Sequence, residues 1–135
     1  MRFLDTNVLL YAVSTDPKER PKRDIAERLI SGRDNGLSVQ VLQEFYVQAT
    51  RATRPRALSH DLATSLIRTW LRFPIQSITV AVMGEALAIK TQANLSYWDA
   101  AIIAAARALG CAELYSEDMQ HGREIAAVKI INPFR

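Results

Sequence analysis

The chain has 135 residues, 49% of them hydrophobic, and its 17 Lys and Arg against 14 Asp and Glu give a net charge of +3. This size predicts one domain over residues 1–135, and the apolar content with so small a net charge excludes an intrinsically disordered chain. The single cysteine excludes an intramolecular disulfide framework and a cysteine-based structural zinc site, and it fits a reducing compartment.

Neither a secretory leader nor a membrane span is expected. An acid at position 5 interrupts the apolar N-terminal run, which a signal-peptide core tolerates poorly. The longest apolar stretches, 8–13 and 100–106, fall far short of the ~20 residues needed to cross a bilayer. We therefore expect a soluble cytoplasmic protein without membrane contacts.

The N-terminal quarter predicts a strand followed by a basic helix. A buried strand runs to about Asp5, and a turn at Thr6-Asn7 leads into further packed chain over 8–13. Residues 17–34 carry an apolar stripe at helical spacing with a basic solvent face, which predicts an amphipathic helix. Asn35-Gly36 is a typical helix stop, because glycine accepts the left-handed conformation after a helix end.

The middle of the chain alternates strands with helices. Residues 37–39 predict a brief strand, and Ser38 is suited to cap a helix that the Arg54-Pro55 pair breaks. A second helix is expected over 58–71, with its inward face at Leu62, Leu66 and Ile67. The alternation of residues 75–78 predicts another strand.

The C-terminal part predicts two helices and two strands. The helices cover 80–93 and 96–109, and the second has the capping-box spacing of Ser96 and Asp99 and ends at Gly110. The strands cover 111–115 and 128–131. Strands alternating with helices imply an α/β fold with a parallel sheet covered on both faces.

Four acids fall where such a sheet binds ligands, outside the carboxyl ends of its strands. Asp5 ends the first strand, and Asp118 follows the strand around position 114. Glu44 lies on the helix after the second strand, and Asp99 lies in the first turn of the helix that precedes the 111–115 strand. We expect these four carboxylates to converge on one edge of the sheet.

Crowded carboxylates repel one another and some would remain protonated at neutral pH, unless a cation offsets their charge. Mg²⁺ or Mn²⁺ prefers such oxygen ligands, keeps several waters and is held by only a few carboxylates. With the ion bound, the pocket would attract a phosphodiester and activate a water for in-line attack. The pattern therefore points to a metal-dependent hydrolase or transferase acting on an anionic substrate.

Each acid also has a plainer interpretation. Asp5 could form an Asx turn after its strand, and Glu44 could be a solvated acid at the margin of an apolar face. Asp99 could only cap its helix, and Asp118 could be an ordinary loop acid, with Glu117 as an alternative ligand. The four together indicate a site more strongly than any one of them.

The same residues resemble a known family. The matching segments are Asp5-Thr6-Asn7-Val8-Leu9-Leu10-Tyr11-Ala12, Ser38-Val39-Gln40-Val41-Leu42-Gln43-Glu44-Phe45, Tyr97-Trp98-Asp99-Ala100-Ala101, Leu114-Tyr115-Ser116-Glu117-Asp118 and Asn132-Pro133-Phe134. In this order and spacing they resemble PIN-domain proteins, above all the VapC-type toxins of toxin–antitoxin pairs. The resemblance covers essentially the whole chain and no motif is broken.

The resemblance implies a three-layer α/β/α domain with a five-stranded parallel sheet and a ribonuclease that depends on Mg²⁺ or Mn²⁺. Asp5, Glu44, Asp99 and Asp118 match the family's catalytic, metal-binding acids. Thr6, Asn7 and Ser116 match polar neighbours that orient a carboxylate or a metal-bound water. The resemblance also implies an RNA substrate, a homodimer, and a cognate antitoxin that covers a hydrophobic groove and obstructs the acidic pocket.

Basic side chains around such a pocket would hold RNA phosphates, although charge runs are more often solvated faces. The candidates for RNA binding are Arg20, Arg23, Arg51 and Arg54. His60 and His121 have no partner at a catalytic spacing, and Cys111 is expected in the core.

Two other functions fit the residues. A different metal-dependent phosphoesterase on the same fold, such as a small-molecule phosphatase, is disfavoured because Asn7 stands where haloacid-dehalogenase-type phosphatases have a second aspartate. A non-catalytic module that regulates a partner by contact would need none of the four acids.

Overall fold

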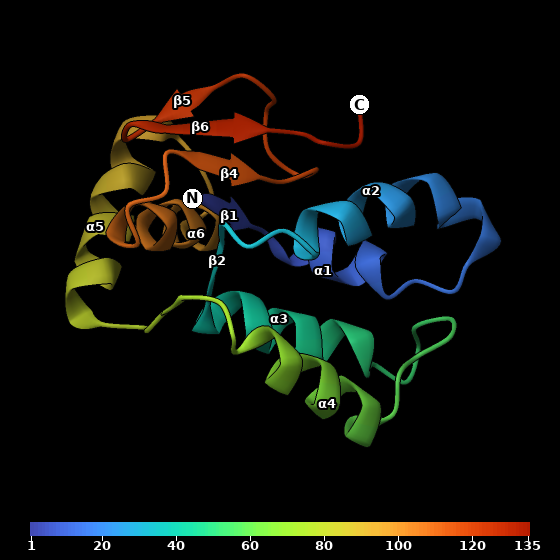
Figure 1. The fold of residues 1–135 in the computed structure, drawn as a ribbon. Coiled ribbons are helices and arrows are strands. Elements are labelled where there is room, and N and C mark those ends of the chain that lie inside the picture. The colour runs from blue at the N-terminus through green and yellow to red at the C-terminus, as the bar shows by residue number, and fades with distance from the viewer.

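A computed structural model describes residues 1–135 as six strands and six α-helices (Figure 1). The strands are β1 (Arg2–Leu4), β2 (Asn35–Ser38), β3 (Ile75–Gln76), β4 (Glu113–Tyr115), β5 (Glu124–Ile125) and β6 (Val128–Ile131). The helices are α1 (Thr6–Ala12), α2 (Arg20–Ile30), α3 (Val39–Ala49), α4 (His60–Trp70), α5 (Val80–Ala93) and α6 (Tyr97–Ala108), and a 3-10 turn, η1, covers Pro17–Glu19. No helix is both long and apolar enough to cross a bilayer.

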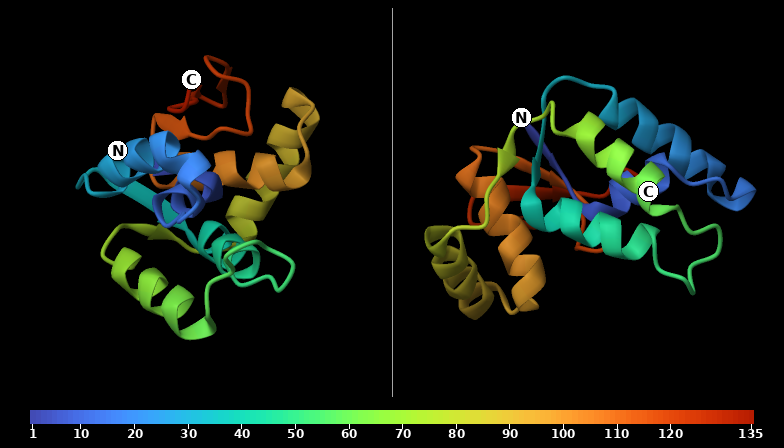
Figure 2. Two further views of the ribbon diagram at one scale, coloured as in Figure 1. Left: turned by 90° about the vertical axis from the view of Figure 1, so that its right-hand side faces the viewer. Right: turned by 90° about the horizontal axis from the view of Figure 1, so that it is seen from below.

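The strands form one sheet in the order β3-β2-β1-β4-β6-β5. The first five of these are mutually parallel, and β5 pairs antiparallel with β6 at the edge. Helices α5 and α6 lie on one face of the sheet and α1 and α2 on the other, as the left view of Figure 2 shows. This confirms the expected three-layer α/β fold with five parallel strands, to which a short sixth strand is added.

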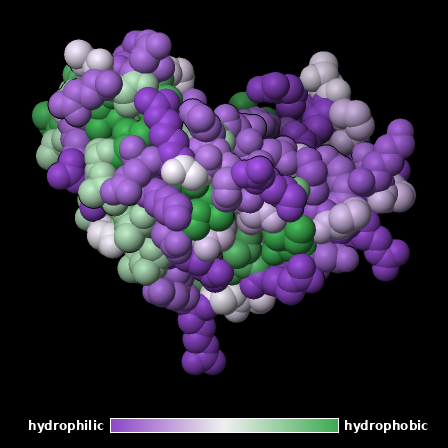
Figure 3. All heavy atoms as spheres, turned by 90° about the horizontal axis from the view of Figure 1, so that it is seen from above, coloured by the Kyte–Doolittle hydropathy of each residue, from purple (hydrophilic) through white to green (hydrophobic).

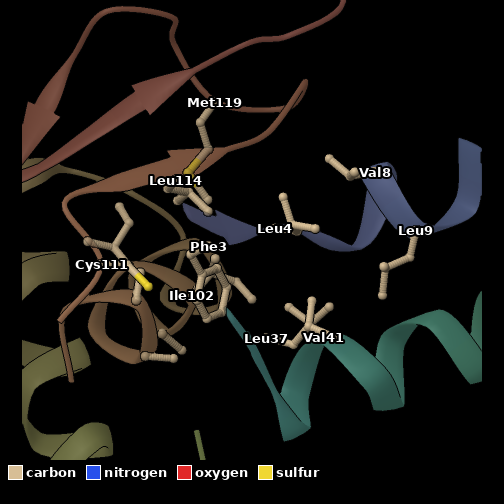
Figure 4. Close-up of a cluster of buried hydrophobic side chains, with 14 of the residues drawn as sticks. Phe3, Leu4, Val8, Leu9, Leu37, Val41, Ile102, Cys111, Leu114 and Met119 are labelled. Atoms are coloured by element: carbon tan, nitrogen blue, oxygen red, sulfur yellow. The ribbon is translucent and has the colours of Figure 1, made fainter. Parts of the chain in front are cut away.

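The core fills the space between the sheet and both helix layers. Thirty buried hydrophobic residues form one cluster, and Figure 4 shows Phe3 and Leu4 of β1 at its centre, between α6 and α3. Helix α6 is buried over seven consecutive residues, Ala100 to Ala106, of which five are alanines. Cys111 lies in this core as expected.

The N-terminal region differs from the prediction in two places. Residues 8–12 belong to α1, which starts at Thr6 without an intervening turn because the Asp5 side chain caps it. Asn35 and Gly36 lie in β2 and do not form a left-handed helix stop. Asn35 still ends α2, but through its side chain, whose Nδ2 donates to the carbonyl oxygens of Leu29 (2.7 Å) and Gly32 (3.1 Å).

Two further differences concern α4 and the last strands. The sequence predicts Leu62 on the inward face of α4, but Leu62 is 49% exposed, and the buried residues Ala63 and Trp70 set that face. Strand β5 was not predicted. It turns into β6 through Ala126 and Ala127, which both adopt positive φ (52° and 64°), a conformation that Asn and Gly normally supply in such two-residue turns.

Candidate active site

The candidate site lies where the sheet order changes direction. Chain connections run from β1 outward to β2 and β3 on one side, whereas β4 lies on the other side of β1. The Asp5 amide donates to the Tyr115 carbonyl oxygen (3.0 Å), so Asp5 and Ser116 emerge side by side from the carboxyl ends of β1 and β4. Open parallel sheets bind their ligands in this crevice.

Asp5 is the buried centre of the site, with only 6% of its surface exposed. Its Oδ1 accepts from the Thr6 amide (2.7 Å) and its Oδ2 accepts from the Ser116 hydroxyl (2.7 Å). Burial nevertheless raises the pKa of the Asp5 carboxyl from 3.8 to about 6, outweighing both hydrogen bonds, and the negative charges of Glu44 and Asp118 add to the rise. An ionised Asp5 is therefore costly without a cation.

Glu44 reaches the site from α3. Its Oε2 accepts from the Thr6 hydroxyl (2.8 Å), so Thr6 bonds to Asp5 through its backbone and to Glu44 through its side chain. Its Oε1 accepts from Gln40 Nε2 (2.9 Å), one helical turn earlier. Gln40 is not among the predicted site residues, although its spacing of four residues from Glu44 on a helix predicts a contact between the two side chains.

Asp118 lies on the loop after β4 and is held by α1. Its Oδ2 accepts from Asn7 Nδ2 (3.1 Å), and its amide donates to the Ser116 hydroxyl oxygen (3.1 Å). Ser116 thus links the Asp118 backbone to the Asp5 carboxylate. Thr6, Asn7 and Ser116 each hydrogen-bond to one of the four acids, and their role in orienting a carboxylate or a metal-bound water stays a prediction.

Glu117, the alternative ligand, points to other partners. Its Oε2 pairs with Lys22 Nζ (2.5 Å) and its Oε1 accepts from the Tyr11 hydroxyl (2.6 Å). Burial alone would raise the pKa of the Glu117 carboxyl, but Lys22 and Tyr11 hold it below its ordinary value. Lys22 therefore already offsets the charge of Glu117, whereas no cation pairs with its neighbour Asp118.

Asp99 enters the site from the first turn of α6. Ser96 caps this helix by accepting from the Asp99 amide (3.1 Å), which confirms the predicted cap. Burial raises the pKa of the Asp99 carboxyl and outweighs the lowering effect of hydrogen bonding to Ser96, and the charges of Asp118 and Glu44 add smaller increases. Asp5 and Asp99 thus each respond to the charges of Glu44 and Asp118, which places the four predicted acids in one neighbourhood. Their catalytic roles stay predictions.

The donor set of the site fits a hard divalent cation. None of the four acids forms a salt bridge with a Lys, Arg or His. No three His, Cys, Asp or Glu side chains close around a single ion as they stand. Mg²⁺ does not need such a cage, because one or two carboxylates and several waters usually complete its shell. A bound cation would offset the uncompensated negative charge of the four acids and would lower the raised pKa values of Asp5 and Asp99.

The predicted RNA-binding arginines lie on other elements and contact none of the four acids. Arg23 pairs with Glu27 along α2 (3.1 Å). Arg54 lines a cavity of about 240 Å³ between the end of α1 and the segment after α3. Arg20 and Arg51 are exposed, on α2 and after α3. Their role in RNA binding stays a prediction.

Comparison with known proteins decides the family. The family model described as the PIN domain matches residues 2–124, which is most of the sequence. The chain belongs to the PIN domain family. A comparison with curated protein sequences finds no significant match.

Solved structures share the fold of this PIN domain at low sequence identity. A toxin–antitoxin complex from Klebsiella pneumoniae is 20% identical, with a TM-score of 0.72 and coverage of 98% of both chains. VapC20 of Mycobacterium tuberculosis, described as a sarcin–ricin loop cleaving toxin, is 21% identical, with a TM-score of 0.66 over 87% of this chain and 92% of its own. VapBC2 of Rickettsia felis, bound to a promoter DNA fragment, is 17% identical, with a TM-score of 0.65 and 96% coverage of both chains.

The buried Asp5 predicts an unusual pH dependence of stability in this PIN domain. Because its pKa rises on folding, to about 6, the contribution of Asp5 to the free energy of unfolding is greatest below pH 4 and is lost as the pH rises through 6. A rise of this size corresponds to about 3 kcal/mol. In EDTA at pH 7.5, Asp5→Asn should therefore unfold at higher urea than the wild type, and the gap should close toward pH 4. Equal urea midpoints for Asp5→Asn and the wild type at pH 7.5 would contradict the conclusion that the buried, ionised Asp5 lowers the stability.

Proposed function

We propose that this PIN domain is the toxin of a type II toxin–antitoxin pair and an endoribonuclease that hydrolyses RNA phosphodiesters with Mg²⁺ or Mn²⁺. The observation that carries the proposal is the convergence of Asp5, Glu44, Asp99 and Asp118 without a single basic partner at the sheet crevice. The toxins among the structural neighbours, one described as cleaving the sarcin–ricin loop, support the choice of RNA.

In this proposal the four acids would hold the divalent cation. When bound, the cation would polarise the phosphodiester as a Lewis acid and would lower the pKa of a water molecule. Thr6 fixes Asp5 relative to Glu44, and Asn7 with Ser116 fixes Asp118 relative to Asp5. One of the carboxylates accepts the proton that the attacking water loses.

Two exposed apolar surfaces support protein partners, which we propose to be an antitoxin and a second copy of this chain. A groove of about 600 Å³ between α3 and α4 is lined almost entirely by hydrophobic residues, among them Leu42, Val47 and Ile67. Around α5, large apolar side chains are exposed, including Val80 (81%) and Trp98 (65%). Figure 3 shows apolar atoms at the end where α5 lies and again nearer the middle of an otherwise mostly hydrophilic face. Exposed apolar patches of this kind mark interaction surfaces.

The proposed function is tested by inducing the wild type and Asp5→Asn at equal protein level, with mapping of cellular RNA ends. We expect growth arrest and discrete new RNA ends for the wild type alone. Arrest by both proteins would instead indicate a non-catalytic module. Hydrolysis of an aryl phosphate by the purified protein, with structured RNA left intact, would indicate a small-molecule phosphatase.

A further inference from the structure

The loop that carries Asp118 is tied to two helices by a closed polar triad. Lys22 Nζ of α2 lies 2.5 Å from Glu117 Oε2, the Tyr11 hydroxyl of α1 donates to Glu117 Oε1 (2.6 Å), and Lys22 also donates to the Tyr11 oxygen (3.2 Å). Each of the three polar ends therefore contacts both others. The triad joins segments about a hundred residues apart in sequence.

The surroundings of the triad restrict its movement. Lys22 also lies over the face of the Tyr11 ring, 4.9 Å from its centroid, and the Phe134 ring packs edge-on against Tyr11 at 4.9 Å. Glu117 retains only 26% of its side-chain exposure. A charge-assisted, partly buried pair of this kind holds its partners more firmly than an exposed surface pair.

Helix α1 holds the loop at two points on one face. Asn7 bonds to the Asp118 carboxylate through Nδ2 (3.1 Å) and to the Glu117 amide through Oδ1 (3.2 Å). Tyr11 lies one turn later and bonds to the Glu117 carboxylate. Backbone and side chain of Glu117 are both anchored, so the next residue, Asp118, has little freedom to leave the acidic cluster.

We propose that Tyr11, Lys22 and Glu117 act as positioning residues, here called the Glu117 lock, that hold Asp118 in the acidic cluster; this role rests on the proposed function. Lys22 also offsets the negative charge of Glu117. Without Lys22, Glu117 would add a fifth uncompensated negative charge beside the four acids, none of which has a cationic partner. Loss of either charged member should therefore release the loop and weaken the site without removing any of the four acids.

The lock is tested with Lys22→Met and Glu117→Gln, which remove a charge at nearly constant size, and with Lys22→Arg as the conservative variant. Arg107→Met is the matched control, because it breaks a cross-helix ion pair to Glu85 (2.9 Å) that involves none of the site residues. The readouts are hydrogen exchange of the 116–119 amides in EDTA, Mn²⁺ affinity by electron paramagnetic resonance, and kcat and KM for RNA cleavage.

In both charge-removing variants we expect the amide hydrogens of residues 116–119 to exchange about tenfold faster, because a loop that is no longer held opens more often. Mn²⁺ affinity and kcat should each fall by about tenfold, as for residues that orient a ligand, with KM unchanged. Lys22→Arg should keep the exchange rate, the Mn²⁺ affinity and kcat close to the wild-type values, and Arg107→Met should match the wild type in all three.

Exchange at the wild-type rate in both variants overturns the lock. Faster exchange with unchanged Mn²⁺ affinity and kcat overturns its positioning role, and a rise in KM alone assigns Lys22 to RNA contact instead. If the wild type cleaves no RNA, the proposed function fails, yet exchange and Mn²⁺ affinity still decide the lock. A wild type that binds no Mn²⁺ overturns both.

Discussion

Chelation of divalent cations with EDTA is expected to reduce RNA cleavage by at least about 10³-fold, and added Mg²⁺ or Mn²⁺ should restore it. The physical reason is charge. Four acids meet at the crevice and no Lys, Arg or His pairs with any of them, so a phosphodiester would be repelled from the metal-free site. The measurement is the initial rate on a structured RNA across a titration of each ion.

Loss of activity in EDTA has to come from the site and not from unfolding. Far-ultraviolet circular dichroism and the melting temperature in EDTA should show a folded protein, because the core of thirty buried hydrophobic residues contains none of the four acids. Undiminished cleavage in EDTA would rule out a metal-dependent reaction.

Asp99→Asn is expected to lower kcat by about 10³-fold, or about 4 kcal/mol of transition-state stabilisation. Asp99 brings its charge to the cluster from α6, an element that contributes no other acid to the site. Because the acids act as a unit, the kcat of the double variant Asp5→Asn/Asp99→Asn should be about equal to that of the less active single variant. Steady-state kinetics with Mg²⁺ in excess provides the comparison.

Glu124→Gln is the control for this series, since Glu124 is an exposed acid of the edge strand β5 and lies outside the site. It should cleave RNA at the wild-type rate. Near-normal kcat for Asp99→Asn, together with normal activity of the control, would remove Asp99 from the catalytic set.

The position of the site follows from short-range features that a sequence shows directly. Asp5 interrupts an apolar run at the end of a strand, and Asp118 follows a second strand. Parallel strands end on the same edge of a sheet, so the convergence of these two acids needed no knowledge of side-chain packing. Glu44 is different, because its direction depends on a hydrogen bond from Thr6, 38 residues away.

The features that were not predicted depend on contacts between distant segments. The inward face of α4 is set by where Ala63 and Trp70 meet the core, and Trp70 packs edge-on against Phe45 of α3 at 4.8 Å. The turn between β5 and β6 places two alanines at positive φ, which sequence preferences disfavour and the strand pairing must stabilise. The neutralisation of Glu117 by Lys22 joins residues 95 positions apart.

Calorimetric titration of Mn²⁺ into the purified, EDTA-stripped protein tests most directly whether Asp5, Glu44, Asp99 and Asp118 form a cation site. We predict saturable binding by the wild type, with protons released at pH 6 and below because the pKa of the buried Asp5 lies at about 6 without the ion. Asp5→Asn and Asp99→Asn should bind at least about tenfold more weakly, and Glu124→Gln should match the wild type. Equal affinity in all four proteins, or no binding by the wild type, would contradict the assignment of this cluster as a metal centre.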